Sequence, residues 1–191
     1  AGSATSIGHA PISSLIDPAI GARQSIAEAL TNLVWAPLTH GLSAVSLSAN
    51  WMWPCRNEGE DSRLYKAVKA VSDYAIELGI NVPTGKDSLS MKQKYPDDEV
   101  IAPGTVIISA VGACDNISKV VEPVLQADGG DIYYIGLSNP QNNKLFQLGG
   151  SAFAQTQNAI GAMAPDVKQG ADFTKIFNDI QGLIRAGNVV A

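Results

Sequence analysis

The sequence is poor in cysteine and histidine. Its 191 residues include two cysteines, Cys55 and Cys114, and two histidines, His9 and His40. Their spacing matches no metal-binding pattern, and neither cysteine lies in a recognisable nucleophile motif. Two buried free thiols in a reducing compartment account for this usage, so we expect a cytoplasmic protein. The alternative is a catalytic thiol, which would need one of the two histidines as its base.

Basic charge and long apolar runs are also scarce. The 13 Lys and Arg residues are outnumbered by 18 Asp and Glu residues, which gives a net charge of −5. This balance argues against a dedicated nucleic-acid-binding protein, which normally carries a basic stripe. No uninterrupted apolar stretch is long enough to cross a bilayer, so we expect no membrane partner. The hydrophobic content of 46% is sufficient for the core of one large domain or two small ones.

Periodicity and turn residues predict the regular elements of the first two thirds of the chain. Residues 1–6 are small and polar and are predicted to be a frayed end. Asp17 and Pro18 are typical of a helix start, and this helix should run to about Trp35. The other predicted elements are a strand over residues 45–51, a helix over 60–78, a loop and strand over 81–92, a polar turn over 95–99 and a buried strand over 106–111.

The composition changes over residues 126–131, and we place a domain boundary there, between units of residues 3–127 and 128–191. The second unit is predicted to contain a strand over 132–137, a turn over 139–144, a helix opened by Gly149-Gly150-Ser151 and an amphipathic helix over 172–185. Residues 189–191 have the pattern of another strand beginning. We therefore expect this chain to be a fragment of a longer protein, with the second unit incomplete.

Glu28 and Asn32 form the first candidate site. They lie four residues apart on the predicted helix and share one face, with Gln24 one turn earlier. A carboxylate and an amide oxygen stacked in this way can coordinate Mg²⁺ directly or through water, beside phosphates. The neighbouring residues are small or apolar and few other charges lie on the helix, so we expect the pair to be largely buried. A solvated helix face is the alternative.

The segment Gly85-Lys86-Asp87-Ser88 forms the second candidate site. It is not a P-loop, because Gly79 lies one residue too far upstream and Asp87 follows the lysine. A lysine and a carboxylate beside a glycine can bind a phosphate or orient a substrate. A surface turn in which Asp87 caps backbone amides is equally compatible.

Two further segments carry weaker signals. Ser48 and Asn50 alternate with apolar residues, so they can line a polar cleft or a half-exposed sheet face. Gly149-Gly150-Ser151 offers free backbone N–H groups for an anion, although glycine also precedes many helices for packing reasons.

These motifs occur in the same order in a known family. The chain resembles the large, single-chain phosphoribosylformylglycinamidine synthases over nearly its whole length. The resemblance rests on Ile7-Gly8, Ala27-Glu28-Ala29-Leu30-Thr31-Asn32, Leu47-Ser48-Ala49-Asn50-Trp51-Met52, Gly59-Glu60-Asp61, Tyr65-Lys66-Ala67-Val68-Lys69-Ala70-Val71, Pro83-Thr84-Gly85-Lys86-Asp87-Ser88-Leu89-Ser90-Met91 and Leu148-Gly149-Gly150-Ser151-Ala152-Phe153-Ala154-Gln155.

The resemblance implies a part of the second of two homologous halves of the synthetase region. Each half is similar to an aminoimidazole ribonucleotide synthetase (PurM-like) subunit. Residues 3–127 would then be its α+β N-terminal domain, and residues 128–191 the truncated start of its α/β C-terminal domain. The family's enzymes are ATP-dependent C–N ligases of de novo purine biosynthesis. They convert formylglycinamide ribonucleotide to formylglycinamidine ribonucleotide, with glutamine as the amido donor.

The resemblance also implies the roles of the candidate residues. In the family this half keeps a structural ADP and Mg²⁺, and Glu28 and Asn32 match positions that hold the metal, with a further aspartate ligand expected beyond Ala191. Lys86, Asp87 and Ser88 would lie near the nucleotide-bearing cleft. The family's catalytic histidine and glutaminase triad lie elsewhere, so we expect no catalytic residue in this chain and no activity of the fragment alone.

The partners implied are the other synthetase half and the glutaminase domain, and the surface left exposed without them should favour self-association. Two alternatives remain. This half could instead lend Lys86, Asp87 or Ser88 to the substrate, or the chain could be a stand-alone PurM-like enzyme. The latter would carry an acidic metal-binding cluster near the N-terminus, which this sequence lacks.

Overall fold

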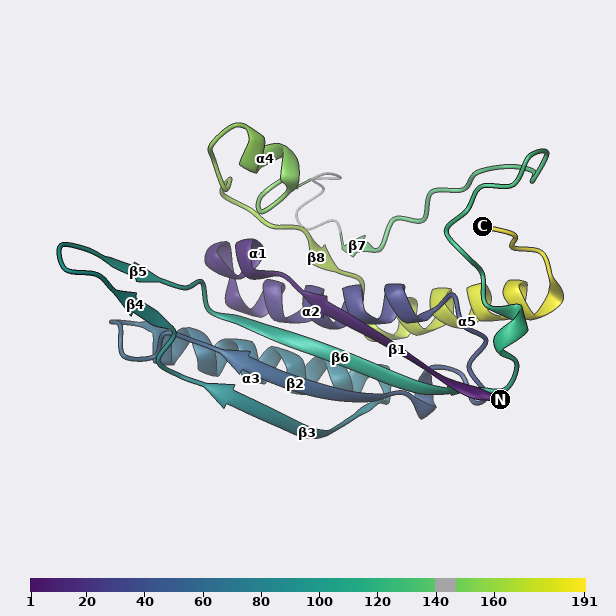
Figure 1. Cartoon of the computed structure of the whole chain (residues 1–191), viewed down its shortest axis with the longest axis horizontal. Helices are drawn as coiled ribbons and strands as arrows, with labels where there is room; N and C mark the ends of the chain where they lie inside the picture. The colour runs from purple at the N-terminus through teal and green to yellow at the C-terminus, as the bar shows by residue number, and fades with distance from the viewer. Residues whose placement is uncertain (140–146) are drawn as a thin grey trace.

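A four-stranded sheet forms the centre of the molecule. The computed structural model describes residues 1–139 and 147–191 (Figure 1). The strand order is β1-β6-β2-β3. β6 runs antiparallel to both of its neighbours, whereas β3 is parallel to β2 and lies at the edge. These strands are β1 (Gly2–His9), β2 (Ser46–Met52), β3 (Asn81–Ser88) and β6 (Thr105–Cys114).

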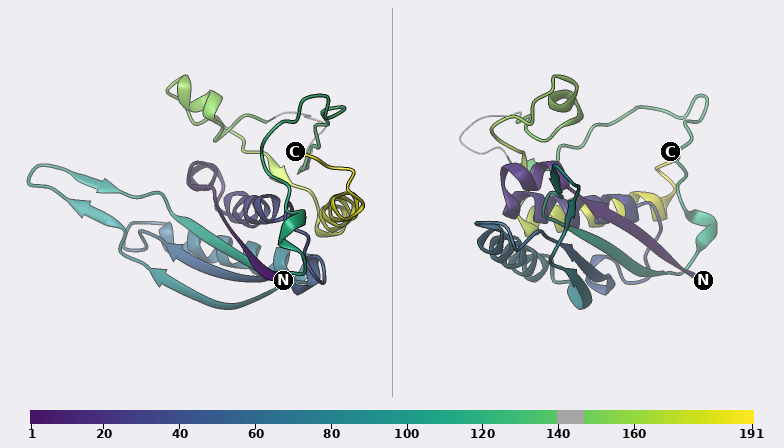
Figure 2. Two further views of the ribbon diagram at one scale, coloured as in Figure 1. Left: turned by 45° about the vertical axis from the view of Figure 1, so that its right-hand side comes forward. Right: turned by 60° about the vertical axis from the view of Figure 1, so that its left-hand side comes forward.

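Two long helices, α2 (Pro18–Leu33) and α3 (Glu60–Leu78), pack on one face of this sheet (Figure 2). The shorter elements are α1 (Pro11–Ile16), η1 (Leu42–Ala44), the hairpin of β4 (Lys92–Lys94) and β5 (Glu99–Ile101), η2 (Ile117–Lys119), β7 (Ser138–Asn139), α4 (Ala152–Thr156) and β8 (Asp166–Val167). A third long helix, α5 (Gly170–Ala186), packs against α3 and η1. The mixed α and β content agrees with the expected fold class.

The core lies between the sheet and the helices. Val45, Leu47 and Ala49 are buried, as their alternation predicted, and so are Val106 and Ile108 of β6. Burying these side chains supplies the main favourable term in folding. The opposite face of the sheet carries the alternate residues and is covered by no helix in the described part of the chain.

The helix start predicted at Asp17 and Pro18 is confirmed, and so is the end of the helix predicted over residues 60–78. The Asp17 side chain accepts hydrogen bonds from the backbone N–H groups of Ala19 and Ile20, and Pro18 occupies the first helical position. Helix α3 ends at Gly79, whose φ of 69° is a left-handed conformation that glycine adopts at little cost. None of the helices in the described residues combines the length and apolar character needed to span a bilayer.

The prediction of a frayed end over residues 1–6 was wrong. Residues 2–6 belong to β1, which pairs with β6 from Gly2↔Cys114 to His9↔Ile107. Gly8 allows β1 to pack closely on α2 as well, because a Cβ there would collide with the backbone of Ser25 and Ala29. A strand of small polar residues was therefore mistaken for an unstructured end.

The strand predicted over residues 132–137 does not form. Ile132, Tyr133 and Tyr134 are 82–89% exposed, and no strand among the described residues pairs with them. Strand propensity depends on a partner strand and a packed face, and this segment has neither here. Residues 189–191 are also not a strand. The turn predicted over residues 139–144 lies, except for its first residue, outside the described residues.

Helix α5, in the second predicted unit, contributes to the same core as the sheet and helices of the first unit. Phe173 and Phe177 are buried within the cluster formed by α2, α3 and the sheet. Arg23 of α2 forms two hydrogen bonds with Asp166, at 2.8 and 2.7 Å. The two predicted units therefore pack on each other, and the boundary between residues 127 and 128 stays a prediction.

Candidate functional site

Glu28 and Asn32 lie on the flank of α2 that packs along β1. The backbone N–H of His9 donates to Glu28 Oε2 at 2.6 Å, and Asn32 Nδ2 donates to the carbonyl of Ile7 at 3.0 Å. Both side chains are therefore held by the backbone of the edge strand. Hydrogen bonds of this kind fix the orientation of the carboxylate and of the amide.

The expectation that this pair is buried was wrong. The Glu28 side chain is 47% exposed, and Asn32 is exposed as well. The reason is that β1 is an edge strand, so the flank of α2 beside it faces solvent. The small residues around the pair, such as Ala27 and Ala29, face the core instead.

Glu28 borders a cavity of about 440 Å³ between α1, α2 and the segment before α4. Gln24 and His9 also line it, as does Gly150. The Gln24 amide is already engaged, because its Nε2 donates to the carbonyl of Pro165. This volume falls within the range of small-molecule sites.

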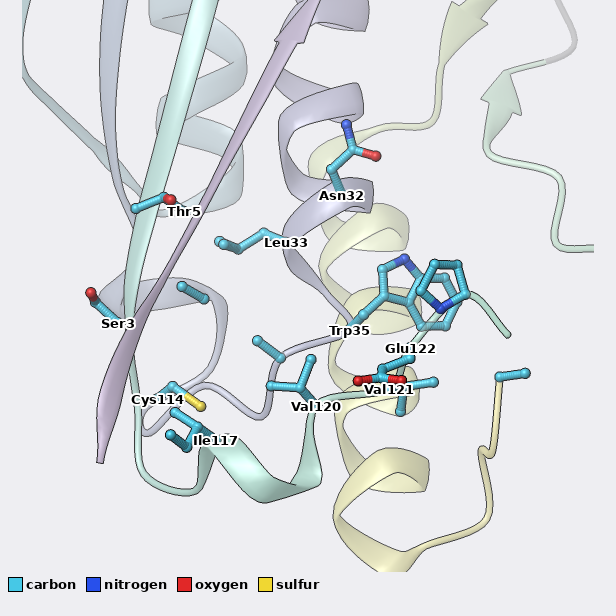
Figure 3. Close-up of a pocket in the computed structure, with 14 residues that line it drawn as sticks. Ser3, Thr5, Asn32, Leu33, Trp35, Cys114, Ile117, Val120, Val121 and Glu122 are labelled. Carbon is cyan, nitrogen blue, oxygen red and sulfur yellow. The ribbon is translucent and has the colours of Figure 1, made fainter. Parts of the chain in front are cut away.

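Asn32 borders a different hollow, a mostly apolar groove of about 640 Å³. Figure 3 shows the Asn32 amide directed away from Ile117 and Val120, which line the other side of this groove. Glu28 and Asn32 therefore share one face of the helix but border separate hollows.

The pair fits a magnesium site only in part. Glu28 Oε1 and Asn32 Oδ1 have no hydrogen-bond partner among the described residues, so two oxygen ligands remain available. Mg²⁺ prefers six oxygen ligands, several of them commonly water or phosphate. Among the described residues, no group of three or more His, Cys, Asp or Glu side chains could hold a metal. Both oxygens are of the type that Mg²⁺ prefers, but the described residues supply too few ligands for a complete site.

Lys86, Asp87 and Ser88 lie within strand β3 and not in a turn. Lys86 and Asp87 are exposed, and Lys86 Nζ contacts Ser88 Oγ. In the described residues Asp87 caps no backbone amide, so the surface-turn interpretation was wrong. Gly85 allows β3 to lie close to β2, since a Cβ there would come within 2.6 Å of the Ala49 carbonyl oxygen.

Asn50 of β2 lies opposite Lys86 in the parallel register. It is half-buried on the sheet face that no described helix covers, as is Ser48. The Asn50 Oδ1 atom is buried and has no hydrogen-bond partner in the described part of the chain. Native structures rarely leave such an atom unpaired, because the lost hydration is not compensated.

The structure does not bring the two candidate sites together. Glu28 lies beside β1 at one edge of the sheet, and Lys86 lies on β3 at the other edge. Neighbouring strands are about 4.8 Å apart, so three strand spacings, about 14 Å, separate β1 from β3.

The weaker candidates have structural roles. Gly149-Gly150-Ser151 opens α4 as predicted, and Ser151 Oγ accepts from the backbone N–H of Ala154. Burial and the nearby carboxylates of Asp61 and Glu60 raise the pKa of Cys55. A raised pKa disfavours the thiolate, which argues against a catalytic thiol at Cys55.

Comparison with known proteins decides the family. Residues 1–113 match the FGAR-AT PurM_N-like domain family. The chain belongs to this family. The fold agrees with this family: the T. maritima PurL structure complexed with FGAR superimposes with a TM-score of 0.65 at 14% identity, over 97% of this chain and 27% of that one. The PurL structure complexed with AMPPCP gives 0.58 at 11% identity, over 97% and 25%.

Curated relatives share more sequence with this FGAR-AT PurM_N-like chain. The Caenorhabditis elegans probable phosphoribosylformylglycinamidine synthase is 41% identical over 184 residues, which cover 96% of this chain and 14% of that protein. The Homo sapiens phosphoribosylformylglycinamidine synthase is 40% identical over 186 residues, covering 96% and 14%. The chain thus spans about one seventh of the length of these relatives.

Proposed function

We propose that this chain is a segment of a phosphoribosylformylglycinamidine synthase, a cytoplasmic ATP- and glutamine-dependent ligase of purine biosynthesis. The names of its relatives at 40–41% identity support this. We further propose that the segment holds an auxiliary Mg²⁺–ADP and does not itself catalyse the reaction. PurL of T. maritima, which shares the fold, is known in complexes with AMPPCP and with FGAR.

The observation that carries the auxiliary site is the arrangement of Glu28 and Asn32. Each has one polar atom fixed by the backbone of β1 and one oxygen left available on the exposed flank of α2. A bound Mg²⁺ would supply positive charge that neutralises the phosphates of a nucleotide. The chain's own contribution would be to hold the two oxygens in place, with the cavity beside Glu28 admitting part of the ligand.

A second candidate function is supported by Asn50. Its unpaired Oδ1 lies beside Lys86 on the open face of the sheet, so a substrate or a partner covering that face would satisfy it. In this case Lys86, Asp87 and Ser88 would contribute to substrate binding at the interface with the other synthetase half. The same open face would allow the isolated chain to self-associate. A stand-alone PurM-like enzyme is disfavoured, because the curated relatives are about seven times longer.

Substitution in the intact synthase separates the two functions. With an auxiliary site, Glu28→Ala combined with Asn32→Ala removes the increase in melting temperature that Mg²⁺ and ADP give, because a ligand stabilises only the state that binds it. Turnover of the protein that remains folded stays near that of the wild type. With a substrate role, Lys86→Ala lowers kcat/KM and leaves the melting temperature unchanged.

If Glu28→Ala with Asn32→Ala leaves the ADP-dependent rise in melting temperature intact, the auxiliary site is not at these residues. Glu58→Ala, at an exposed glutamate before α3, is the matched control and should change neither quantity.

A further inference from the structure

A polar hollow of about 500 Å³ lies at the end of the sheet where β2 and β3 terminate. Three cationic side chains line it, those of Arg56, Lys92 and Lys94, together with Ser90 and Asn57. No Asp or Glu is among the described residues that line it. It shares no lining residue with the cavity beside Glu28.

The walls of this hollow are held together by the backbone. Trp53 N–H donates to the Ser88 carbonyl at 2.8 Å, and Cys55 N–H donates to the Leu89 carbonyl at 3.1 Å. Trp53 is fully buried and anchors the loop after β2 in the core. The opposite wall continues into the β4–β5 hairpin, which projects from the sheet near the start of α3 (Figure 1). The hollow is therefore a defined feature of the fold.

Lys92 is held in place inside the hollow. Its Nζ lies 3.1 Å from Asn57 Oδ1 and 3.1 Å from Glu99 Oε1, and its side chain is 22% exposed. Asn57 Nδ2 in turn donates to the Pro54 carbonyl at 2.8 Å. Asn57 thus acts as a positioning residue for Lys92, whose charge Glu99 partly compensates.

The other two cations are not compensated. Arg56 and Lys94 form no ion pair among the described residues. The carboxylates of Glu60 and Glu99, which lie close to them in the sequence, pair with other cations. Of these, Glu60 pairs with Arg63 at 3.2 Å. Arg56 and Lys94 both line the hollow, and a bound anion would be attracted by their positive charge.

We propose that this hollow binds a small phosphate-bearing anion. The guanidinium of Arg56 can donate two parallel hydrogen bonds to phosphate oxygens, and Lys92 and Lys94 supply positive charge beside it. The Ser90 hydroxyl can donate a further hydrogen bond. This site is independent of the auxiliary Mg²⁺–ADP site, because it uses different residues at a different place on the molecule.

The test is calorimetric titration of the 191-residue chain with inorganic phosphate at low ionic strength. We expect saturable binding that weakens about tenfold in Arg56→Gln and in Lys94→Gln, since charge-assisted hydrogen bonds are lost. Arg56→Lys should bind better than Arg56→Gln. Lys66→Gln, at an exposed lysine of α3 without an ion pair in the described residues, is the matched control and should bind like the wild type.

Titration with ribose 5-phosphate identifies the source of the phosphate. Tighter binding of ribose 5-phosphate than of inorganic phosphate would indicate a phosphorylated sugar, and equal affinity would indicate recognition of the phosphate alone. Glu28→Ala should bind phosphate like the wild type, so this result does not depend on the auxiliary site. The proposal is overturned if the wild type shows no saturable phosphate binding, or if Arg56→Gln and Lys94→Gln bind like Lys66→Gln.

Discussion

Among single residues, Gln181 of α5 makes three buried hydrogen bonds to distant backbone groups. It is 4% exposed, its Oε1 accepts from Leu38 N–H at 2.9 Å, and its Nε2 donates to the carbonyls of Val34 and Ala36. Three backbone groups in the segment that follows α2 thus depend on one side chain. No sequence pattern pointed to Gln181, because its partners lie more than 140 residues earlier.

We predict that Gln181→Ala lowers the free energy of unfolding by about 2–4 kcal/mol, because it leaves buried backbone groups without partners. Urea unfolding measures this. Gln157→Ala, at an exposed glutamine, should change the stability by less than about 0.5 kcal/mol. Equal effects of the two substitutions would show that the contacts of Gln181 contribute nothing.

The raised pKa of Tyr74 leads us to predict that stability depends on pH. Burial, with smaller contributions from Glu77 and Asp166, raises the pKa of Tyr74 well above the ordinary value of about 10. Its hydroxyl donates to the Lys168 carbonyl at 3.1 Å. With a raised folded-state pKa, the folded state binds more protons than the unfolded state above pH 10. Stability is therefore fully present below about pH 10 and decreases as the pH rises further.

The expected decrease from Tyr74 alone is at most about 1.4 kcal/mol per pH unit. In Tyr74→Phe this part of the alkaline decrease disappears, while stability at pH 8 falls by about 1 kcal/mol through loss of the hydrogen bond. Urea unfolding at pH 8 and pH 10.5 gives both numbers. Tyr65→Phe, at a tyrosine that is 70% exposed, should show the wild-type pH dependence. Identical pH profiles of wild type and Tyr74→Phe would contradict the assignment.

At the scale of elements, the contact between β1 and α2 depends on Gly8. A Cβ at this position would collide with the Ser25 carbonyl oxygen and the Ala29 nitrogen. Gly8→Ala should lower stability by about 2–3 kcal/mol or more, because the backbone of both elements must move apart. Thermal or urea unfolding measures the change.

Gly182 of α5 provides the opposite case. It is exposed, and a Cβ there meets no atom within 4 Å. Gly182→Ala should therefore raise stability by about 0.5–1 kcal/mol, because alanine restricts the unfolded chain and favours helix. If Gly8→Ala were as well tolerated as Gly182→Ala, β1 would not pack on α2 as described.

Elements with local signals could be predicted from the sequence. Asp17 and Pro18 begin α2, Gly79 ends α3, and both signals act within a few residues. β1 could not be predicted, because its strand character comes from pairing with β6 about a hundred residues later. The prediction of a strand over residues 132–137 was wrong for the converse reason: the side chains favour a strand, but no partner strand lies beside them among the described residues.

The candidate site was predictable in part. Helical spacing correctly placed Glu28 and Asn32 on one face, but it could not show that this face lies at an edge of the sheet. For the same reason, the sequence could not show that Lys86 lies on the opposite edge. Arg56 and Lys94 were missed because their convergence depends on how the loop after β2 packs against β4.

At the scale of the whole molecule, α5 should unfold together with the sheet. Phe177 is 3% exposed in the common core, so Phe177→Ala should lower stability by about 3–5 kcal/mol. The loss of stability should shift the unfolding transition followed by tryptophan fluorescence, since Trp35, Trp51 and Trp53 all lie outside α5. Phe153→Ala, at a phenylalanine that is 61% exposed, is the control. An unchanged fluorescence transition in Phe177→Ala would mean that residues 128–191 unfold as a separate domain.

The central claim is that the α2 pair holds a magnesium nucleotide in the intact synthase. The most direct measurement is the amount of ADP released when the purified, intact enzyme is denatured, in the wild type and in Glu28→Ala combined with Asn32→Ala. The account predicts about one ADP per wild-type chain and none in the variant, together with a lower melting temperature. Equal release from both proteins, or none from either, would contradict it and leave Glu28 and Asn32 as residues that only join α2 to β1.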